Sequence, residues 1–316
     1  MWEFLLWFGI FAVSLFILLK ASQYFTDSAE KIGLMLGISH FIIGVTIVSI
    51  GTSLPELVSS IVAVIDDSSE IVSGNVLGSN IANIFLILGI ASIIGGRFKI
   101  KTNLLPVDLP IMMTSAFFLA LTIWDGVFSF GEAILFVASF IIFILYAANS
   151  GKTSSKATKE TEESEKIPFR VKPVLVMILS AVFVYLGATY TIEAVIKISE
   201  IFHVGAEIIA MSAVAIGTSL PELAVTISAV KKKNPEMVVG NVLGSNIFNA
   251  FAVMGIPGLI SELDVPGSLI SVGLPVMLAA SILFLVVIVD RQVSKWEGWM
   301  FLVFYGFFLG KIFNLL

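Results

Sequence analysis

Long apolar segments constrain this chain more than any other feature. Apolar stretches of about 20 residues recur along its 316 residues, and each could cross a hydrocarbon core about 30 Å thick. Only 13% of the residues are charged, whereas a soluble domain carries roughly 25%, so the chain has too little charge to cover a water-facing surface. The stretches lack the two-residue alternation of a membrane barrel. We therefore predict an all-α, polytopic membrane protein.

The apolar segments divide into ten predicted transmembrane helices. A polar segment rich in Lys, Glu, Ser and Thr interrupts them between Ser150 and Pro168, and it has little apolar surface to bury. We predict a cytoplasmic linker loop at 150–169 between a first five-helix repeat, 1–149, and a second, 170–316. The predicted spans are about 3–24, 38–65, 70–95, 105–124, 129–149, 171–200, 205–230, 236–260, 267–290 and 295–314.

The basic residues predict the orientation of these spans. If the N-terminus faces outward, 16 of the 18 Lys and Arg residues fall on the inner side, and only Lys197 and Lys311 fall on the outer side. Cytoplasmic loops of membrane proteins are enriched in Lys and Arg. We therefore expect a multi-pass cell-membrane protein whose termini are both extracellular.

Two motifs recur at one fixed offset. GTSLPEL at Gly51–Leu57 returns at Gly217–Leu223, and GNVLGSNI at Gly74–Ile81 returns at Gly240–Ile247, each 166 positions later. Because each unit has an odd number of predicted spans, the two copies would cross the membrane in opposite senses. Inverted repeats with a shared site near the membrane midplane are a recurrent plan in secondary transporters.

Each copy of the first motif puts a glutamate inside an apolar span. A charge at that depth costs about 2.5–3.5 kcal/mol on insertion scales. Lys and Arg lie almost entirely in predicted loops, so neither Glu56 nor Glu222 has an evident basic partner. Two such carboxylates indicate a cation between them. The alternative is a pair of protonated glutamates that hydrogen-bond between helices, which does not account for their symmetric placement.

A proline directly precedes each glutamate. Pro55 and Pro221 have no N–H, so the carbonyls of Gly51 and Gly217 lose their helical partners and each helix is predicted to kink. Bare backbone oxygens at membrane depth are tolerated only where they face protein or a wet cavity. Together with carboxylate and hydroxyl oxygens, they form a ligand set for hard cations such as Ca²⁺. An ordinary proline kink is the alternative interpretation.

Uncharged polar side chains occupy the same helical faces. Hydroxyl residues stand three and four positions before each glutamate, and polar residues spaced by four follow in the next helix, where they share one face. These residues are Thr52, Ser53, Thr218 and Ser219, and then Asn75, Ser79, Asn83, Asn241, Ser245 and Asn249. They are candidate oxygen ligands, with interhelical hydrogen bonding as the alternative role. The motif glycines, such as Gly74 and Gly78, are expected to allow close helix packing.

The doubled motif resembles the alpha repeats of the cation/calcium exchanger superfamily, and it is most similar to prokaryotic sodium/calcium exchangers. The resemblance covers nearly the whole chain. It implies a secondary antiporter, without enzymatic activity or cofactor, that exchanges Ca²⁺ for Na⁺ by alternating access. The long first and sixth spans, which lack the motifs, would slide against the core.

The resemblance also implies a role for each polar motif position. Glu56 and Glu222, with the carbonyls of Thr52 and Thr218, would form the calcium site. The sodium sites would use Ser49, Ser53, Ser79, Ala215, Ser219 and Ser245, the first and fourth through their backbone carbonyls. Asn83 and Asn249 would line the middle of the core. Several relatives have Asp in place of Asn249, so this core holds two carboxylates rather than three, which argues against potassium dependence.

Two other functions are compatible with the residues. A calcium/proton exchanger is the nearer one, because two glutamates can also carry protons, although GTSLPE favours Na⁺. A non-transporting intramembrane enzyme belongs to a different class and would need a nucleophile with a base, or a metal cluster. The chain has no cysteine, and neither His40 nor His203 lies near the motifs. We expect a monomer in the lipid bilayer, with Ca²⁺ and Na⁺ as its ligands and no nucleic-acid partner.

Overall fold

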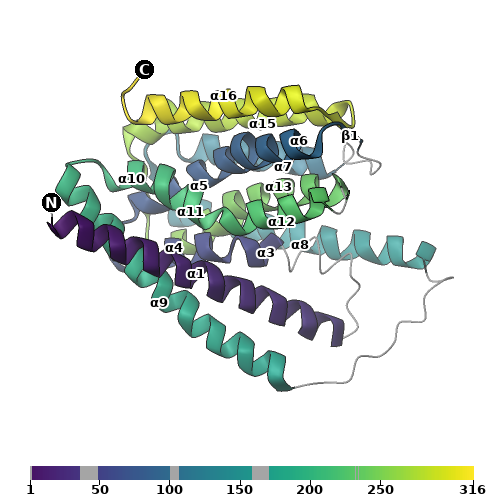
Figure 1. The fold of residues 1–316 in the computed structure, drawn as a ribbon, viewed down its shortest axis with the longest axis horizontal. Coiled ribbons are helices and arrows are strands. Elements are labelled where there is room, and N and C mark those ends of the chain that lie inside the picture. Colours follow the sequence, from purple (N-terminus) through teal and green to yellow (C-terminus); the bar gives the residue numbers. More distant parts are fainter. Residues whose placement is uncertain (1, 36–48, 100–106, 159–170, 232, 234) are drawn as a thin grey trace.

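The computed structural model describes residues 2–35, 49–99, 107–158, 171–231, 233 and 235–316, and helices dominate them (Figure 1). In the first half, the helical elements are α1 (Trp2–Met35), α3 (Ser49–Thr52), α4 (Leu54–Ile65), α5 (Glu70–Ile81), the π-helical η2 (Ala82–Leu88), α6 (Gly89–Gly95), α7 (Asp108–Thr122) and α8 (Phe130–Thr158). In the second half, they are α9 (Val171–Phe202), α10 (Ala206–Ile209), η3 (Ala210–Val214), α11 (Ala215–Thr218), α12 (Leu220–Lys231), α13 (Pro235–Phe248), η4 (Asn249–Val253), α14 (Met254–Gly258), η5 (Leu269–Gly273), α15 (Leu274–Val289) and α16 (Lys295–Ile312).

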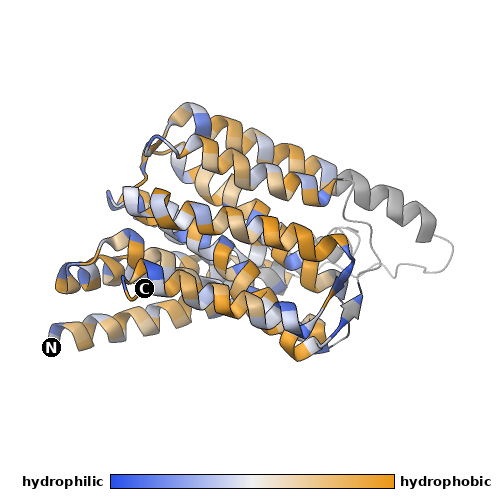
Figure 2. Cartoon of the chain, turned by 90° about the horizontal axis from the view of Figure 1, so that it is seen from above, coloured by the Kyte–Doolittle hydropathy of each residue, from blue (hydrophilic) through white to orange (hydrophobic). Residues whose placement is uncertain are grey.

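Seven helical segments of the described chain are long and apolar enough to cross a membrane. They are Trp2–Phe25, Glu70–Gly95, Phe130–Ala147, Val171–Phe202, Ala206–Lys231, Met237–Gly258 and Leu269–Val289. Helices suit a hydrocarbon core because they satisfy their backbone hydrogen-bonding groups internally. Apolar residues run along the helices, with polar residues mainly towards their ends (Figure 2). The prediction of an all-α, multi-pass membrane fold is confirmed.

Three of the ten predicted spans, 38–65, 105–124 and 295–314, are not among these seven. The described part of the first contains α3 and α4, which have 4 and 12 residues, and that of the second contains α7, which has 15 residues. The third corresponds to α16, which carries Lys295, Glu297 and Lys311. Residues 38–48 and 105–106 lie outside the described part of the chain. The count of ten spans therefore stays a prediction.

The predicted start of the linker loop is wrong. Residues 150–158 are helical, because α8 continues to Thr158. Lysine is a good helix former, and no proline interrupts the sequence before Pro168, so the helix can continue beyond its apolar part. The remaining predicted loop residues, 159–169, lie outside the described residues.

The motif helices lie between two flanking layers. In Figure 1, α1 and α9 pack along each other on one side, and α15 and α16 lie on the opposite side, with α3–α5 and α10–α13 between them. α9 packs tightly on α1 at Gly187, where a Cβ would be 2.8 Å from the backbone nitrogen of Leu18. A glycine is therefore required for this helix contact.

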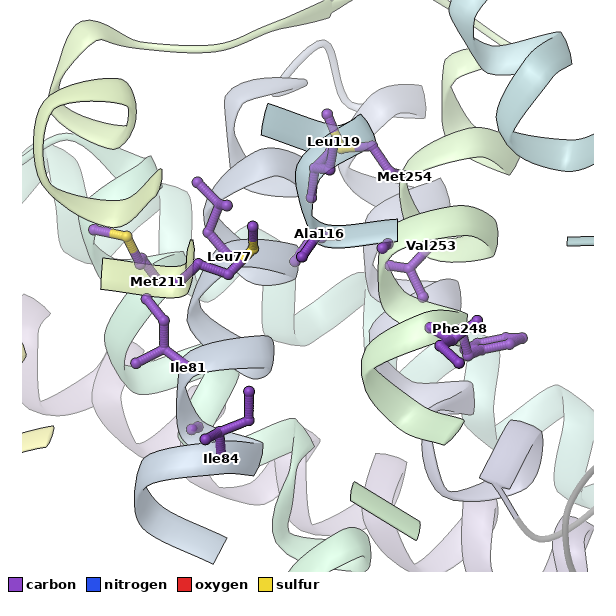
Figure 3. Close-up of a cluster of buried hydrophobic side chains, with 14 of the residues drawn as sticks. Leu77, Ile81, Ile84, Ala116, Leu119, Met211, Phe248, Val253 and Met254 are labelled. Carbon is purple, nitrogen blue, oxygen red and sulfur yellow. The ribbon is translucent and has the colours of Figure 1, made fainter. Parts of the chain in front are cut away.

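Apolar side chains fill one face of the motif helices. Figure 3 shows this cluster, which α5, η2, α7, η3, α13, η4 and α14 build together: Leu77, Ile81, Ile84, Ala116, Leu119, Met211, Phe248, Val253 and Met254. None of these side chains is more than 4% exposed. Gly78 of α5 brings the helix into direct contact with η3, because a Cβ there would clash with the carbonyl of Met211. The cluster fixes α5 and α13, which carry the polar stripes of the motifs.

The 166-residue offset of the sequence also appears in the backbone. The helix is interrupted at Ser53 between α3 and α4, and again at Ser219 between α11 and α12. The helix that follows each interruption ends close to a residue with left-handed backbone, Asp67 in the first half and Lys233 in the second, each with φ of 54°. The two motif regions therefore have the same local conformation.

The short strands join the two halves. β1 (Phe98–Lys99) pairs antiparallel with β4 (Gln292–Val293), and β2 (Val127–Phe128) pairs antiparallel with β3 (Leu263–Asp264). Phe98 of β1 pairs with Val293 of β4. The position 166 residues after Phe98 is Asp264, the position 166 residues before Val293 is Val127, and these two residues also pair. The two ribbons are therefore copies of each other.

Candidate cation-binding site

The twelve positions to which the resemblance assigns an ion ligand or a place in the lining of the core are all buried, each at 4% exposure or less. They lie on the two interrupted helices and on the two helices that follow them. From the first motif region these are Ser49, Thr52, Ser53, Glu56, Ser79 and Asn83, and from the second Ala215, Thr218, Ser219, Glu222, Ser245 and Asn249.

The interruption in each helix places a glutamate at the start of a new helix. Pro55 lies in the first turn of α4, and Pro221 in the first turn of α12. Proline suits this position because the N–H groups of a first helical turn have no intrahelical acceptor. The glutamate that follows each proline is also in the first turn, where the helix dipole favours negative charge. The motif therefore fixes a carboxylate at an interior helix end.

Crossed hydrogen bonds join the two motifs. Ser53 Oγ donates to Glu222 Oε1 at 2.6 Å, and Ser219 Oγ donates to Glu56 Oε1 at 3.3 Å. Each serine thus contacts the glutamate of the other half. Ser245 Oγ donates a further bond to Glu222 Oε1 at 3.3 Å. The structure brings the two glutamates and three of the four serine hydroxyls that were predicted as Na⁺ ligands into one polar centre.

This centre contains buried polar atoms without partners. Among the described residues, Glu56 Oε2 and Glu222 Oε2 accept no hydrogen bond, and both amide atoms of Asn83 and of Asn249 lack a partner. No basic side chain in this part of the chain pairs with either glutamate. Buried polar atoms in native proteins almost always have a partner, so this concentration indicates a place where an ion or water binds.

The threonines of the motif use their hydroxyls within their own helices. Thr52 Oγ1 donates to Ser49 O at 3.1 Å, and Thr218 Oγ1 donates to Val214 O at 3.0 Å. The carbonyl of Ser49 also accepts the N–H of Ser53 at 3.2 Å. The hydroxyl hydrogens of both threonines are therefore already engaged, while their hydroxyl oxygens and backbone carbonyls keep lone pairs that can face an ion.

Asn75 makes a contact that the sequence does not assign. Its Nδ2 donates to the backbone carbonyl of Glu56 at 3.3 Å and to Ser60 Oγ at 3.3 Å. Its Oδ1 accepts a hydrogen bond from Ser79 Oγ at 3.4 Å. Asn75 therefore fastens α5 to the helix that carries the glutamate.

Asn241 repeats this arrangement in the second half. Its Nδ2 donates to the backbone carbonyl of Glu222 at 3.1 Å and to Thr226 Oγ1 at 3.0 Å. The sequence does contain a signal for these contacts, since a hydroxyl residue, Ser60 or Thr226, follows each glutamate by four positions. Matched hydroxyls on one helix and asparagines on the next are what an interhelical pair requires.

The composition of the centre limits what it can bind. No cluster of three or more His, Cys, Asp or Glu side chains suited to a metal ion occurs in the described part of the chain. Hard cations accept carboxylate, hydroxyl, amide and carbonyl oxygens, and this centre offers two carboxylates surrounded by neutral oxygens. His203 is exposed near the end of α9, and His40 lies outside the described residues.

Comparison with known proteins agrees with this geometry. The family model described as sodium/calcium exchanger protein matches residues 6–149 and 172–313, which include every polar motif position discussed above. The chain belongs to the sodium/calcium exchanger protein family. Members of this family are transporters, which places the chain in a different class from the intramembrane enzymes.

Several prokaryotic relatives match over nearly their whole length. Sodium/calcium exchanger MaX1 of Methanosarcina acetivorans is 34% identical, and the match covers 98% of this chain and 99% of that protein. Inner membrane protein YrbG of Escherichia coli is 29% identical over 92% of this chain and 91% of its own. A solved structure of the sodium-calcium exchanger NCX_Mj has a TM-score of 0.68 and 30% identity, covering 96% of this chain and 98% of that one.

Proposed function

We propose that this chain is a secondary antiporter that exchanges Ca²⁺ for Na⁺ across a cell membrane. The observation that carries the proposal is the pair Glu56 and Glu222, two buried carboxylates from different halves of the chain. Each accepts a serine hydroxyl from the other half and keeps one oxygen without a partner among the described residues. Two negative charges balance one Ca²⁺. The exchangers MaX1 and NCX_Mj, named for sodium and calcium, support the choice of ions.

The ligands follow from this centre. Ca²⁺ binds Glu56 and Glu222, together with the carbonyls of Thr52 and Thr218, because Ca²⁺ takes six to eight oxygen ligands. Na⁺ binds on either side of this position. Its ligands are the hydroxyls of Ser53, Ser79, Ser219 and Ser245 and the carbonyls of Ser49 and Ala215. Asn83 and Asn249 line the space between, where their amide groups have no partner in the described part of the chain.

The transport cycle uses the repeated architecture. We take the chain to cross the membrane ten times, as two inverted five-helix repeats joined by a cytoplasmic linker, with both termini extracellular. The repeated helix interruptions, the copied ribbons and the distribution of basic residues support this arrangement. α1 and α9 carry none of the motif residues and pack on each other, so they can slide together against the core and open the site to one side at a time. One chain contains both glutamates, so a monomer suffices.

Radioactive Ca²⁺ uptake into proteoliposomes that contain the purified protein tests the proposal. An outward Na⁺ gradient should drive uptake, whereas a pH gradient in Na⁺-free buffer should not. Glu200→Gln is a suitable control, because Glu200 is exposed and pairs with Lys197 outside the site. Uptake that ignores the Na⁺ gradient and follows the pH gradient would replace the proposal with a calcium/proton exchanger.

A further inference from the structure

Two equivalent serines point their hydroxyls in different directions. Ser79 and Ser245 are 166 positions apart in the repeat, and both are 0% exposed. Ser79 Oγ donates to the amide oxygen of Asn75 at 3.4 Å. Ser245 Oγ instead donates to the carboxylate of Glu222 at 3.3 Å. The structure therefore contains one example of each of two orientations available to this hydroxyl.

The asparagine one turn before each serine has a fixed orientation. A backbone carbonyl can only accept hydrogen bonds, so the atom of Asn75 next to Glu56 O must be its nitrogen, and the same holds for Asn241 next to Glu222 O. A second donor bond, to Ser60 or Thr226, holds each nitrogen in place. The amide oxygens are thereby left for other donors.

The two amide oxygens differ in occupancy. Asn75 Oδ1 accepts the hydroxyl of Ser79. Asn241 Oδ1 is buried and has no partner among the described residues. Ser245 stands four positions later on the same helical face, and its hydroxyl is turned to Glu222. In the described part of the second half, Asn241 Oδ1 could therefore accept the hydroxyl of Ser245, which donates to Glu222 instead.

Cation binding would require the serine hydroxyl to change its acceptor. A serine oxygen that ligates Na⁺ must direct its hydrogen away from the ion, and a buried O–H without an acceptor costs free energy. A glutamate oxygen that no hydroxyl contacts also offers more of its lone pairs to Ca²⁺. Reorientation of the serine side chain, which moves its O–H from glutamate to asparagine, serves both ends at once.

We propose that Asn75 and Asn241 are positioning residues of the exchanger, whose amide oxygens accept the hydroxyl hydrogen of Ser79 or Ser245 whenever that serine oxygen ligates a cation. When the ion leaves, the hydrogen of Ser245 returns to Glu222, whereas Ser79 keeps Asn75 as its acceptor. This inference rests on the proposed function, because it takes the two serines as Na⁺ ligands. It adds two residues outside the ligand set and gives each a specific task.

A double-mutant cycle between Asn241 and Ser245 tests the proposal. The variants are Asn241→Leu, which keeps the approximate shape without polar atoms, Ser245→Ala, and the two combined. The readout is the Na⁺ concentration that half-inhibits Ca²⁺ binding to the purified protein. Each single change should raise this concentration about tenfold, the effect of losing one hydrogen bond to a charged centre. The double variant should match Ser245→Ala alone, because the asparagine acts through that hydroxyl.

Asn246 provides the matched control. It lies on the same helix at 2% exposure, and its Nδ2 donates to the carbonyl of Val242 in its own helix at 2.9 Å. Asn246→Leu combined with Ser245→Ala should show additive effects. The corresponding cycle of Asn75→Leu and Ser79→Ala decides the question independently if Asn241→Leu does not fold.

Additive effects on Na⁺ affinity in both asparagine–serine cycles would overturn the inference, because a purely structural role does not depend on the serine hydroxyl. This outcome differs from failure of the proposed function. In that case the wild-type protein itself would show no competition between Na⁺ and Ca²⁺. If the wild-type ions compete and the cycles are additive, only the positioning role fails.

Discussion

Ser53 in the first motif donates a hydrogen bond of 2.6 Å to Oε1 of Glu222 in the second motif. A bond of this length between a hydroxyl and a carboxylate is of the strong, charge-assisted type. The reciprocal bond runs from Ser219 to Glu56 at 3.3 Å. An ion that recruits either serine oxygen therefore changes the hydrogen bonding of the opposite glutamate, so the Na⁺ and Ca²⁺ positions are linked through shared atoms.

Removing these two hydroxyls should weaken Na⁺ binding selectively. In Ser53→Ala combined with Ser219→Ala, the Na⁺ concentration for half-maximal Ca²⁺ uptake should rise about tenfold or more, because each change removes one oxygen ligand at a charged centre. Ca²⁺ affinity should change less, since both carboxylates stay. Ser281→Ala is the matched control, because Ser281 is also buried but donates to Met277 O in its own helix. Unchanged Na⁺ dependence would favour protons as the counter-ion.

Cysteine labelling should report the orientation of the spans. The chain has no cysteine, so an introduced one reacts without background. Asp66 and Lys99 are both exposed and lie before and after the apolar segment Glu70–Gly95. A membrane-impermeant maleimide added to cells should label Asp66→Cys, whereas Lys99→Cys should react only after the membrane is opened. The reverse pattern would contradict the orientation inferred from the basic residues.

Two glycines of the repeat should respond oppositely to alanine. A Cβ at Gly74 would lie 2.5 Å from the carbonyl oxygen of Glu207, whereas no atom of the described part lies within 4 Å of one at Gly240. Gly74→Ala should destabilise the protein by about 1–3 kcal/mol through overpacking. Gly240→Ala should be neutral or stabilising by up to about 1 kcal/mol, because alanine is the better helix former. Thermal unfolding in detergent measures both, and equal effects would contradict the packing of α5 on α10.

The exchange cycle should carry net charge. Two carboxylates neutralise one Ca²⁺, and the neutral oxygens around both glutamates are numerous enough for Na⁺ on either side, so we expect three Na⁺ per Ca²⁺. One positive charge would then leave the vesicle for each Ca²⁺ taken up, and moving one charge corresponds to about 2.3 kcal/mol per 100 mV. An inside-positive potential, set with K⁺ and valinomycin, should therefore accelerate Na⁺-driven Ca²⁺ uptake. Uptake that does not respond to the potential would indicate two Na⁺ per Ca²⁺.

The buried centre could be predicted because its residues lie close together in the sequence of each motif. A carboxylate beside a proline in an apolar span has few roles. Its presence at Glu56 and again at Glu222 favours one of them, a cation held between the two carboxylates. The polar positions of both motifs proved to be buried together. Helix interruptions were expected at the prolines, and in the structure they fall two residues earlier, at Ser53 and Ser219.

Contacts between the halves could not be read in the same way. Nothing in the motif states that Ser53 bonds Glu222 and not Glu56, because that depends on how α3 meets α12 in space. The different orientations of Ser79 and Ser245 are likewise invisible in two identical motifs, since a hydroxyl rotation leaves no trace in sequence. The continuation of α8 to Thr158 was missed because polar composition alone does not exclude a helix.

Binding of Ca²⁺ to the purified protein, measured in the presence and absence of Na⁺, tests the central claim most directly. The wild-type chain should bind one Ca²⁺, and Na⁺ should displace it cooperatively. Glu56→Gln and Glu222→Gln should each abolish both binding and transport, because each removes half of the charge that balances the ion, whereas Glu200→Gln should behave like the wild type. Na⁺-sensitive Ca²⁺ binding that persists in correctly folded Gln variants would contradict the assignment of the two glutamates.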